Sequence, residues 1–252
     1  MTAPAPDDLR RTWRLELAVV LAVTFGLSAY TALLRLVEGT LLGLGGQTVA
    51  LNPRRSQFDL IDLGLNLAGV AQLLGWGALA LYLLWRSGIR PADVGLGRFA
   101  WRADGLGGVG LAALIGLPGI GLYLAARALG LSAAVQPVEP YDTWWRIPVL
   151  LVLAFANAWA EEIVVVGYLM TRLRQLRFGV AAAIVAAALL RGCYHLYQGY
   201  SAGLGNVAMG LVFGYVWWRT GRLWPLIVGH AVIDAVAFAG YALAAEHLDW
   251  LG

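Results

Sequence analysis

Long apolar runs separated by short polar connections extend over almost the whole chain. A helix needs about 20 apolar residues to cross roughly 30 Å of hydrocarbon, and seven runs reach or approach that length. They fall at 15–37, 60–85, 105–128, 147–170, 180–199, 202–219 and 223–245. The pattern therefore predicts an all-α protein, a polytopic transmembrane helical bundle of about seven spans.

The segment 39–58 interrupts this pattern. It is rich in glycine and contains the dipeptide Asn52-Pro53, which marks turns and loops. We expect an external loop here, or a re-entrant piece that would form an eighth membrane element.

Composition agrees with a membrane protein. The chain has 252 residues, of which 60% are hydrophobic and 13% charged, whereas soluble domains are about 25% charged. No internal repeat or second domain is visible, so we expect residues 1–252 to form one transmembrane domain. The lipid bilayer is then a partner. Nucleic acid is not expected, because the arginines that give the net charge of +3 lie between the spans.

The distribution of arginine predicts the orientation. All 18 basic residues are arginine, and twelve of them lie in the N-terminus or in alternate connections, against five on the opposite side. Because positively charged loops stay in the cytoplasm, we expect a cytoplasmic N-terminus. We expect the protein to be integral to a bacterial inner membrane.

Two adjacent carboxylates, Glu161 and Glu162, lie well inside the fourth apolar run. One acid at the bilayer centre costs roughly 2.5–3.5 kcal/mol, and a whole protein is stable by only about 5–15 kcal/mol. An unpartnered pair would use much of that stability. The pair therefore indicates a functional site for which other spans supply partners.

Candidate partners lie in two later runs. Arg191 and His195 are four residues apart, and so are His230 and Asp234, so each pair shares one face of its helix. A single polar residue of this kind often only hydrogen-bonds a neighbouring helix. Six ionisable residues in three neighbouring spans are better explained by a site.

The depths of these residues agree. If the fourth and fifth spans form a hairpin that turns near 177–178, then Glu161 and His195 lie level, and counting from the last turn brings His230 to the same half of the bilayer. Such a set suits water activation. A glutamate in an apolar setting is a usable general base, and a histidine can donate to a developing oxyanion.

At this point the chain resembles a known family, the CPBP intramembrane endopeptidases, which include the CAAX prenyl endopeptidases and proteins linked to bacteriocin processing or immunity. Their motifs are Glu-Glu-x3-Arg, Phe-x3-His and His-x3-Asn or Asp, each on a transmembrane helix. Here the motifs begin at Glu161, Arg191 and His230. The resemblance covers about residues 145–240, within a core at about 145–245.

The resemblance implies that Glu161 and His195 activate water and that Glu162 supports them. His230 and Asp234 would line the oxyanion side, and the substrate would be a membrane-associated protein or peptide. Members have been described both as metalloproteases and as metal-free glutamic proteases. A zinc ion held by Glu161, His195 and His230 is one alternative. We favour the version without a cofactor, because no His-Glu-x2-His helix is present.

Two departures from the family pattern matter. Val166 replaces the motif arginine, while Arg191 replaces the phenylalanine of the second motif. These two positions lie at the same depth in the bilayer if the fourth and fifth spans form the predicted hairpin. We therefore hypothesise that Arg191 neutralises Glu162 from the facing helix. Asp234 replaces the asparagine of some members. Since an ionised aspartate cannot donate a hydrogen bond, it would orient His230 or be protonated.

The sequence therefore predicts an intramembrane endopeptidase. One alternative is a non-catalytic membrane scaffold or immunity protein of the same fold. A less favoured alternative is a proton-coupled transporter that uses the buried acids and histidines as a relay.

Overall fold

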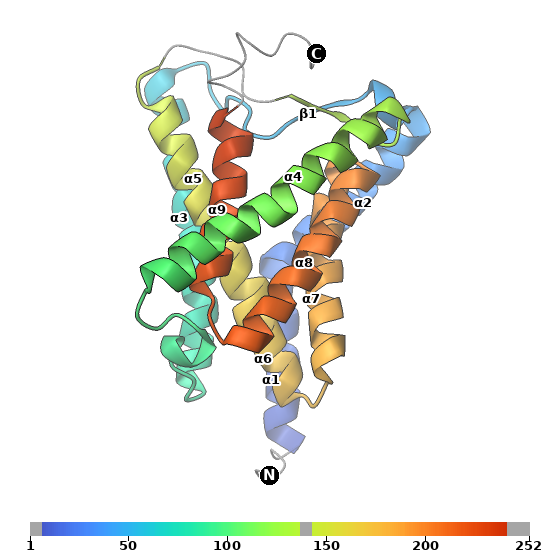
Figure 1. The fold of residues 1–252 in the computed structure, drawn as a ribbon. Helices are drawn as coiled ribbons and strands as arrows, with labels where there is room; N and C mark the ends of the chain where they lie inside the picture. Colours follow the sequence, from blue (N-terminus) through green and yellow to red (C-terminus); the bar gives the residue numbers. More distant parts are fainter. Residues whose placement is uncertain (1–6, 137–142, 241–252) are drawn as a thin grey trace.

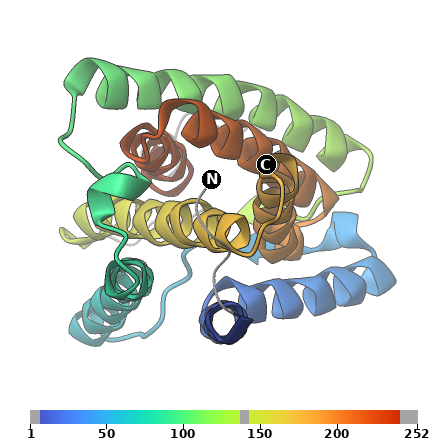
Figure 2. The ribbon, with the colours of Figure 1, turned by 90° about the horizontal axis from the view of Figure 1, so that it is seen from below.

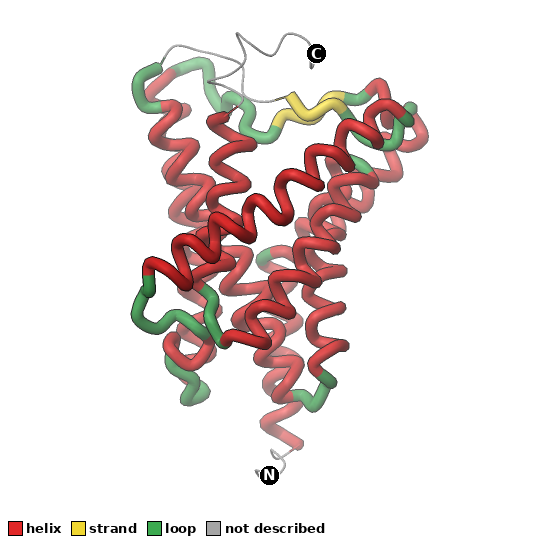
Figure 3. Tube along the Cα trace, viewed as in Figure 1, coloured by secondary structure: helices red, strands yellow, loops and turns green. Residues whose placement is uncertain are grey.

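The fold is almost entirely helical. A computed structural model describes residues 7–136 and 143–240, and helices account for most of their length (Figures 1 and 3). The α-helices are α1 (Asp7–Val23), α2 (Phe25–Leu42), α3 (Asp59–Arg86), α4 (Gly107–Ala128), α5 (Arg146–Glu161), α6 (Leu169–Gln175), α7 (Val180–His195), α8 (Tyr200–Thr220) and α9 (Trp224–Ala235).

Short 3-10 and π-helices join or extend these elements. The 3-10 helices are η1 (Leu44–Gly46), η2 (Pro91–Val94) and η5 (Leu196–Gln198), and the π-helices are η3 (Trp101–Leu106), η4 (Glu162–Tyr168) and η6 (Val236–Gly240). The all-α prediction is thus confirmed. In the segment 39–58, helix α2 ends at Leu42, and the regular elements that follow are η1 and one three-residue strand. This segment is therefore a loop and not a re-entrant helix.

The prediction of seven spans is not confirmed. Within residues 7–136 and 143–240, four helical segments are long and apolar enough to cross a membrane: 59–86, 101–128, 146–175 and 180–198. The expected first span is broken at Thr24, where α1 and α2 meet at 50°, and this bent pair would make a fifth. Helix α8 is not among these segments. Helix α9 is short, and part of the expected run 223–245 lies outside the described residues.

The continuous helix formed by α5, η4 and α6 lies at the centre of the bundle. In its most apolar stretch, 72% of the residues are buried within the protein, whereas in the other three spans the buried share is 11–39%. Viewed along the bundle, it lies between α3, α1 and α2 on one side and α9, α8 and α4 on the other (Figure 2). A helix that is apolar all round belongs in such a place.

Helices α7 and α8 approach each other closely because small residues face each other. A Cβ atom added to Gly210 would lie 2.6 Å from the Cα atom of Ala188, and one added to Gly192 would lie 2.8 Å from the carbonyl oxygen of Gly203. Without a hydrophobic driving force between helices in lipid, such backbone proximity supplies much of the packing energy. This contact fixes α7, which carries Arg191 and His195.

The connection between α3 and α4, residues 87–106, contacts the turn between α8 and α9 and fixes its position. Gly95 has φ +97° and accepts a hydrogen bond from the amide of Leu223. A Cβ atom at Gly95 would lie 2.5 Å from that amide nitrogen, so both backbone conformation and space require glycine. Arg222 forms an ion pair with Asp104 at 2.5 Å. These contacts fix the start of α9, the helix of His230.

On the opposite side of the molecule, two three-residue strands join the loops that follow α2 and α4. Strands β1 (Thr48–Ala50) and β2 (Ala134–Gln136) pair in parallel, with Val49 opposite Val135 (Figure 3). This small ladder ties two loops together and forms no sheet core.

The packing of α7 on α8 predicts a position-specific effect of one methyl group. We expect Gly210→Ala to push the two backbones apart and to destabilise the protein by about 1–3 kcal/mol, as overpacking does. The measurement is the thermal unfolding midpoint of the purified protein in detergent.

Gly205→Ala on the same helix is the matched control, since its Cβ atom would meet only Leu122 at 3.7 Å, an ordinary contact. Equal midpoints for the two variants would contradict this packing account.

Candidate active site

The two glutamates lie where the central helix changes its geometry. Helix α5 ends at Glu161 and the π-helix η4 begins at Glu162, and both side chains are buried, with 3% and 0% exposure. All seven residues of η4 are buried. A π-helical turn accommodates an extra residue and often occurs at functional sites. Here it places two successive carboxylates inside the bundle.

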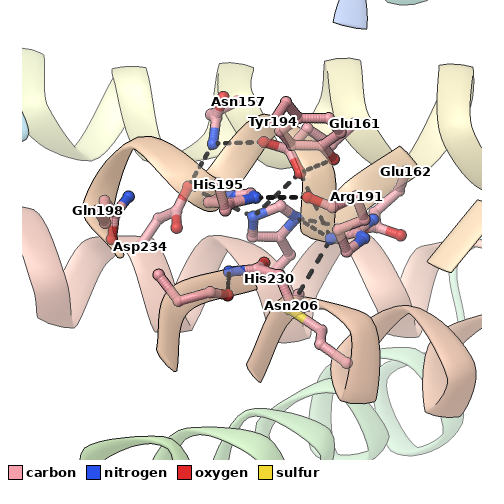
Figure 4. A network of polar contacts seen from close by, with 12 residues as sticks. Asn157, Glu161, Glu162, Arg191, Tyr194, His195, Gln198, Asn206, His230 and Asp234 are labelled. Carbon is pink, nitrogen blue, oxygen red and sulfur yellow. Dashed lines mark hydrogen bonds and ion pairs between the residues drawn. The ribbon is translucent and has the colours of Figure 1, made fainter. Parts of the chain in front are cut away.

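Arg191 of α7 bridges both carboxylates. Its Nη2 atom lies 2.6 Å from Glu162 Oε1, and its Nη1 atom lies 3.4 Å from Glu161 Oε2 (Figure 4). The guanidinium is fully buried and packs over the ring of Phe213 at 5.7 Å. The ion pair expected between Arg191 and Glu162 is therefore formed, from the helix that faces the acids.

His230 of α9 lies between all three acids. Its Nδ1 atom is 2.7 Å from Glu162 Oε1, while its Nε2 atom is 3.9 Å from Glu161 Oε2 and 3.6 Å from Asp234 Oδ2. An ionised carboxylate only accepts hydrogen bonds, so Nδ1 carries the proton given to Glu162. This contact fixes the ring and directs Nε2 towards Glu161 and Asp234.

His195 is oriented by the backbone of its own helix. Its Nδ1 atom lies 3.0 Å from the carbonyl oxygen of Arg191. A carbonyl oxygen only accepts, so Nδ1 donates, and Nε2 of the neutral ring is left as a proton acceptor. The ring is half-buried, and within the described ranges no direct hydrogen bond joins it to Glu161.

Asn157 links the first glutamate to Asp234. Its Nδ2 atom donates to Glu161 Oε1 at 3.2 Å and to Asp234 Oδ2 at 2.8 Å, so one amide group satisfies both acids. The sequence singled out Asp234 but offered little reason to choose Asn157, one helical turn before Glu161. Asn206, a further polar residue of α8, donates to the carbonyl oxygen of Ala202 in its own helix.

Tyr194 is the site residue that sequence reasoning missed. Its hydroxyl donates to Glu161 Oε2 at 2.5 Å, and its ring stacks on Phe25 with centroids 4.9 Å apart. Tyr194 lies three residues after Arg191 and thus on nearly the same face of α7. That spacing is the signal that could have identified it.

A cavity reaches the site from the side of α2. Its volume is about 300 Å³, and Tyr194 separates it from Glu161. The lining residues are Ser28, Thr31, Ala32, Arg35, Tyr194 and Tyr197. Most of them are polar, although they lie among lipid-facing side chains of α2 such as Leu27 and Leu34. Tyr194 therefore lies between this cavity and the carboxylates.

The donor set does not fit a metal ion. In the parts of the chain that the structure describes, no three histidine, cysteine or acidic side chains are grouped as metal ligands. Glu161 and Glu162 instead share the positive charge of Arg191, which would repel a divalent cation placed beside it. The alternative set of Glu161, His195 and His230 is thus not arranged to hold zinc.

Comparison with known proteins identifies one family. Residues 143–236 match the family model described as type II CAAX prenyl endopeptidase, Rce1-like. This range contains the acids, both histidines, Arg191, Tyr194 and Asn157 of the polar network, whereas Phe25 and the cavity residues of α2 lie outside it. Searches of curated proteins and of solved structures find no match.

The buried ion pair predicts a strong coupling between two positions. Arg191→Met removes the guanidinium at similar length and leaves Glu162 buried without its charge partner, which should cost about 3–5 kcal/mol. Adding Glu162→Gln removes the charge that needs compensation, so the double variant should recover much of this loss. The measurement is a double-mutant cycle of unfolding free energies in detergent.

Additive effects of Arg191→Met and Glu162→Gln would show that the two groups do not stabilise each other. The exposed pair Arg35–Glu38, at 2.8 Å, provides the control cycle. Its coupling should stay below about 1 kcal/mol.

Proposed function

We propose that this chain, whose residues 143–236 belong to the Rce1-like family of type II CAAX prenyl endopeptidases, hydrolyses peptide bonds of a membrane-associated protein or peptide. One observation carries the proposal. Glu161 is buried in an apolar bundle, yet both of its oxygens have partners. Asn157 and Tyr194 each donate a hydrogen bond to one oxygen, and Arg191 lies 3.4 Å from the oxygen that Tyr194 binds. A carboxylate held in this way at the family's catalytic position is suited to act on water.

Glu161 and His195 would activate the nucleophile. A water molecule beside Glu161 gives its proton to the carboxylate while its oxygen attacks the carbonyl carbon of the scissile bond. The free Nε2 atom of His195 can hold the same water or share its proton. The proton then passes to the leaving nitrogen as the carbon–nitrogen bond breaks, which restores the ionised Glu161.

His230 would stabilise the negative charge that develops on the substrate oxygen. With Nδ1 bound to Glu162, its Nε2 atom can donate when the ring is protonated, and that atom lies 3.9 Å from Glu161 Oε2 and 3.6 Å from Asp234 Oδ2. Asp234 would orient the ring and accept from Asn157, so it needs no proton of its own. Arg191 would balance Glu162 and keep the site ordered. No step in this scheme uses a metal ion.

The two alternatives make different demands. A scaffold or immunity protein of the same fold does not need the proton-transfer groups, so Glu161→Gln would leave its function intact. A proton-coupled transporter would move solute into vesicles when a pH gradient is applied.

We infer further, from the distribution of the arginines, that the chain resides in a bacterial inner membrane with its N-terminus in the cytoplasm.

The proposal predicts that Glu161→Gln abolishes proteolysis without unfolding the protein. The amide keeps the size of the side chain and one of the two acceptor oxygens that Asn157 and Tyr194 use, but it cannot take a proton from water. The measurement is quantitative mapping of new protein termini in membranes of cells that express the wild type or the variant at matched levels.

Termini that disappear in Glu161→Gln and persist in the control Glu38→Gln would support hydrolysis at this site and identify the substrate. Glu38 is an exposed glutamate on α2 that pairs with Arg35. Identical termini in all three samples would contradict the enzymatic function.

A further inference from the structure

A second buried ion pair lies at the other end of η4, away from the carboxylates. Arg172 of α6 is fully buried. Its Nε and Nη2 atoms both lie 2.8 Å from Glu16 Oε1 of α1. The remaining contacts reach Ser87 Oγ at 3.0 Å, Gln175 Oε1 at 2.7 Å and the carbonyl oxygen of Leu83 at 3.1 Å. The guanidinium thus donates four hydrogen bonds, and its Nη2 atom also forms an ion pair with Glu16.

Tyr168, the last residue of η4, belongs to the same cluster. Its hydroxyl donates to Glu16 Oε1 at 2.8 Å, and its ring lies 5.5 Å from the guanidinium carbon of Arg172. One oxygen of Glu16 thus accepts from two residues of the central helix. The side chain of Glu16 keeps 19% exposure, and α1 approaches α6 here.

The π-helix η4 needs such anchors because π-helical geometry is less stable than α-helical geometry. The amide of Leu169 bonds the carbonyl of Val164, five residues back, instead of the four of an α-helix. If η4 relaxed to an α-helix, the segment on one side would rotate by about 100° relative to the other, which is the turn per residue of an α-helix. Glu162 at the start and Tyr168 at the end could not both keep their partners.

We propose that Glu16 is a positioning residue for the carboxylate pair, acting through Tyr168 and Arg172. Arg191 and His230 hold the first residue of η4, and Glu16 holds its last residue and the following turn. The N-terminal helix α1 therefore fixes the rotation at which Glu161 meets Tyr194. This role rests on the proposed function of Glu161, but the geometry on which it depends can be measured without activity.

The test replaces Glu16 by alanine and, separately, Tyr168 by phenylalanine, which removes only one hydroxyl. Fluorotyrosine placed at Tyr194 reports through its fluorine resonance on the hydrogen bond to Glu161, which lies at the other end of η4. We expect Glu16→Ala to shift or broaden this resonance and Tyr168→Phe to do so to a smaller extent. The control Glu38→Ala should leave it unchanged.

The second readout uses the substrate identified from the mapped termini. A displacement of Glu161 should lower kcat by roughly 10- to 100-fold, as small misplacements of reacting groups do, with KM within about twofold of the wild type. Restoration of kcat by glutamine at position 16, which retains an acceptor oxygen, would support positioning.

An unchanged Tyr194 resonance in both variants would overturn the proposal, even if Glu16→Ala lowers the unfolding temperature. If Glu16→Ala does not fold, Tyr168→Phe decides alone. If no termini depend on Glu161, the proposed function fails, but a shifted resonance would still support the anchoring of η4 by Glu16.

Discussion

The need to keep two adjacent carboxylates charged inside an apolar bundle determines most of this structure. Isolated ions in such a medium cost several kcal/mol each, and only a closely placed counter-charge with further hydrogen bonds offsets that cost. Arg191 provides the counter-charge to both Glu161 and Glu162. For its guanidinium to reach them, α7 must cross the central helix at this depth. The glycines of α7 and α8 and the loop that holds the start of α9 maintain the arrangement.

The same arrangement gives the site its chemical character. Because donors from α5, α7 and α9 are already aligned, little reorganisation is needed when charge develops in a reaction, and this preorganisation is usually the largest contribution to catalysis. The two histidines are held differently. His195 is held by its own backbone, and His230 by Glu162. Each ring therefore presents its Nε2 atom in a defined direction.

The sequence predicted which residues gather in the bundle better than it predicted the course of the chain. Intramembrane charges are rare, so Glu161, Glu162, His230 and Asp234 were visible at once. Counting from the hairpin turn placed Arg191 level with Val166, one helical turn from Glu162. Tyr194 was missed because a tyrosine in an apolar run usually only packs. The break at Thr24 carries no proline, but Gly26 permits it, because a Cβ atom there would lie 2.5 Å from the carbonyl oxygen of Leu21. The ring of Phe25 then packs against Tyr194 and Trp76, which the sequence did not indicate. The π-helix likewise depends on anchors distant in sequence, such as Glu16.

The most direct test is whether the purified chain itself cleaves peptide bonds. Wild-type protein and Glu161→Gln, each reconstituted in liposomes, would be incubated with a peptide library prepared from membrane proteins, with and without a metal chelator, and the new termini identified by mass spectrometry. The account predicts termini that the wild type produces equally well in both conditions and that Glu161→Gln does not produce. Cleavage by Glu161→Gln at the wild-type rate, or none by the wild type under any condition, would contradict it.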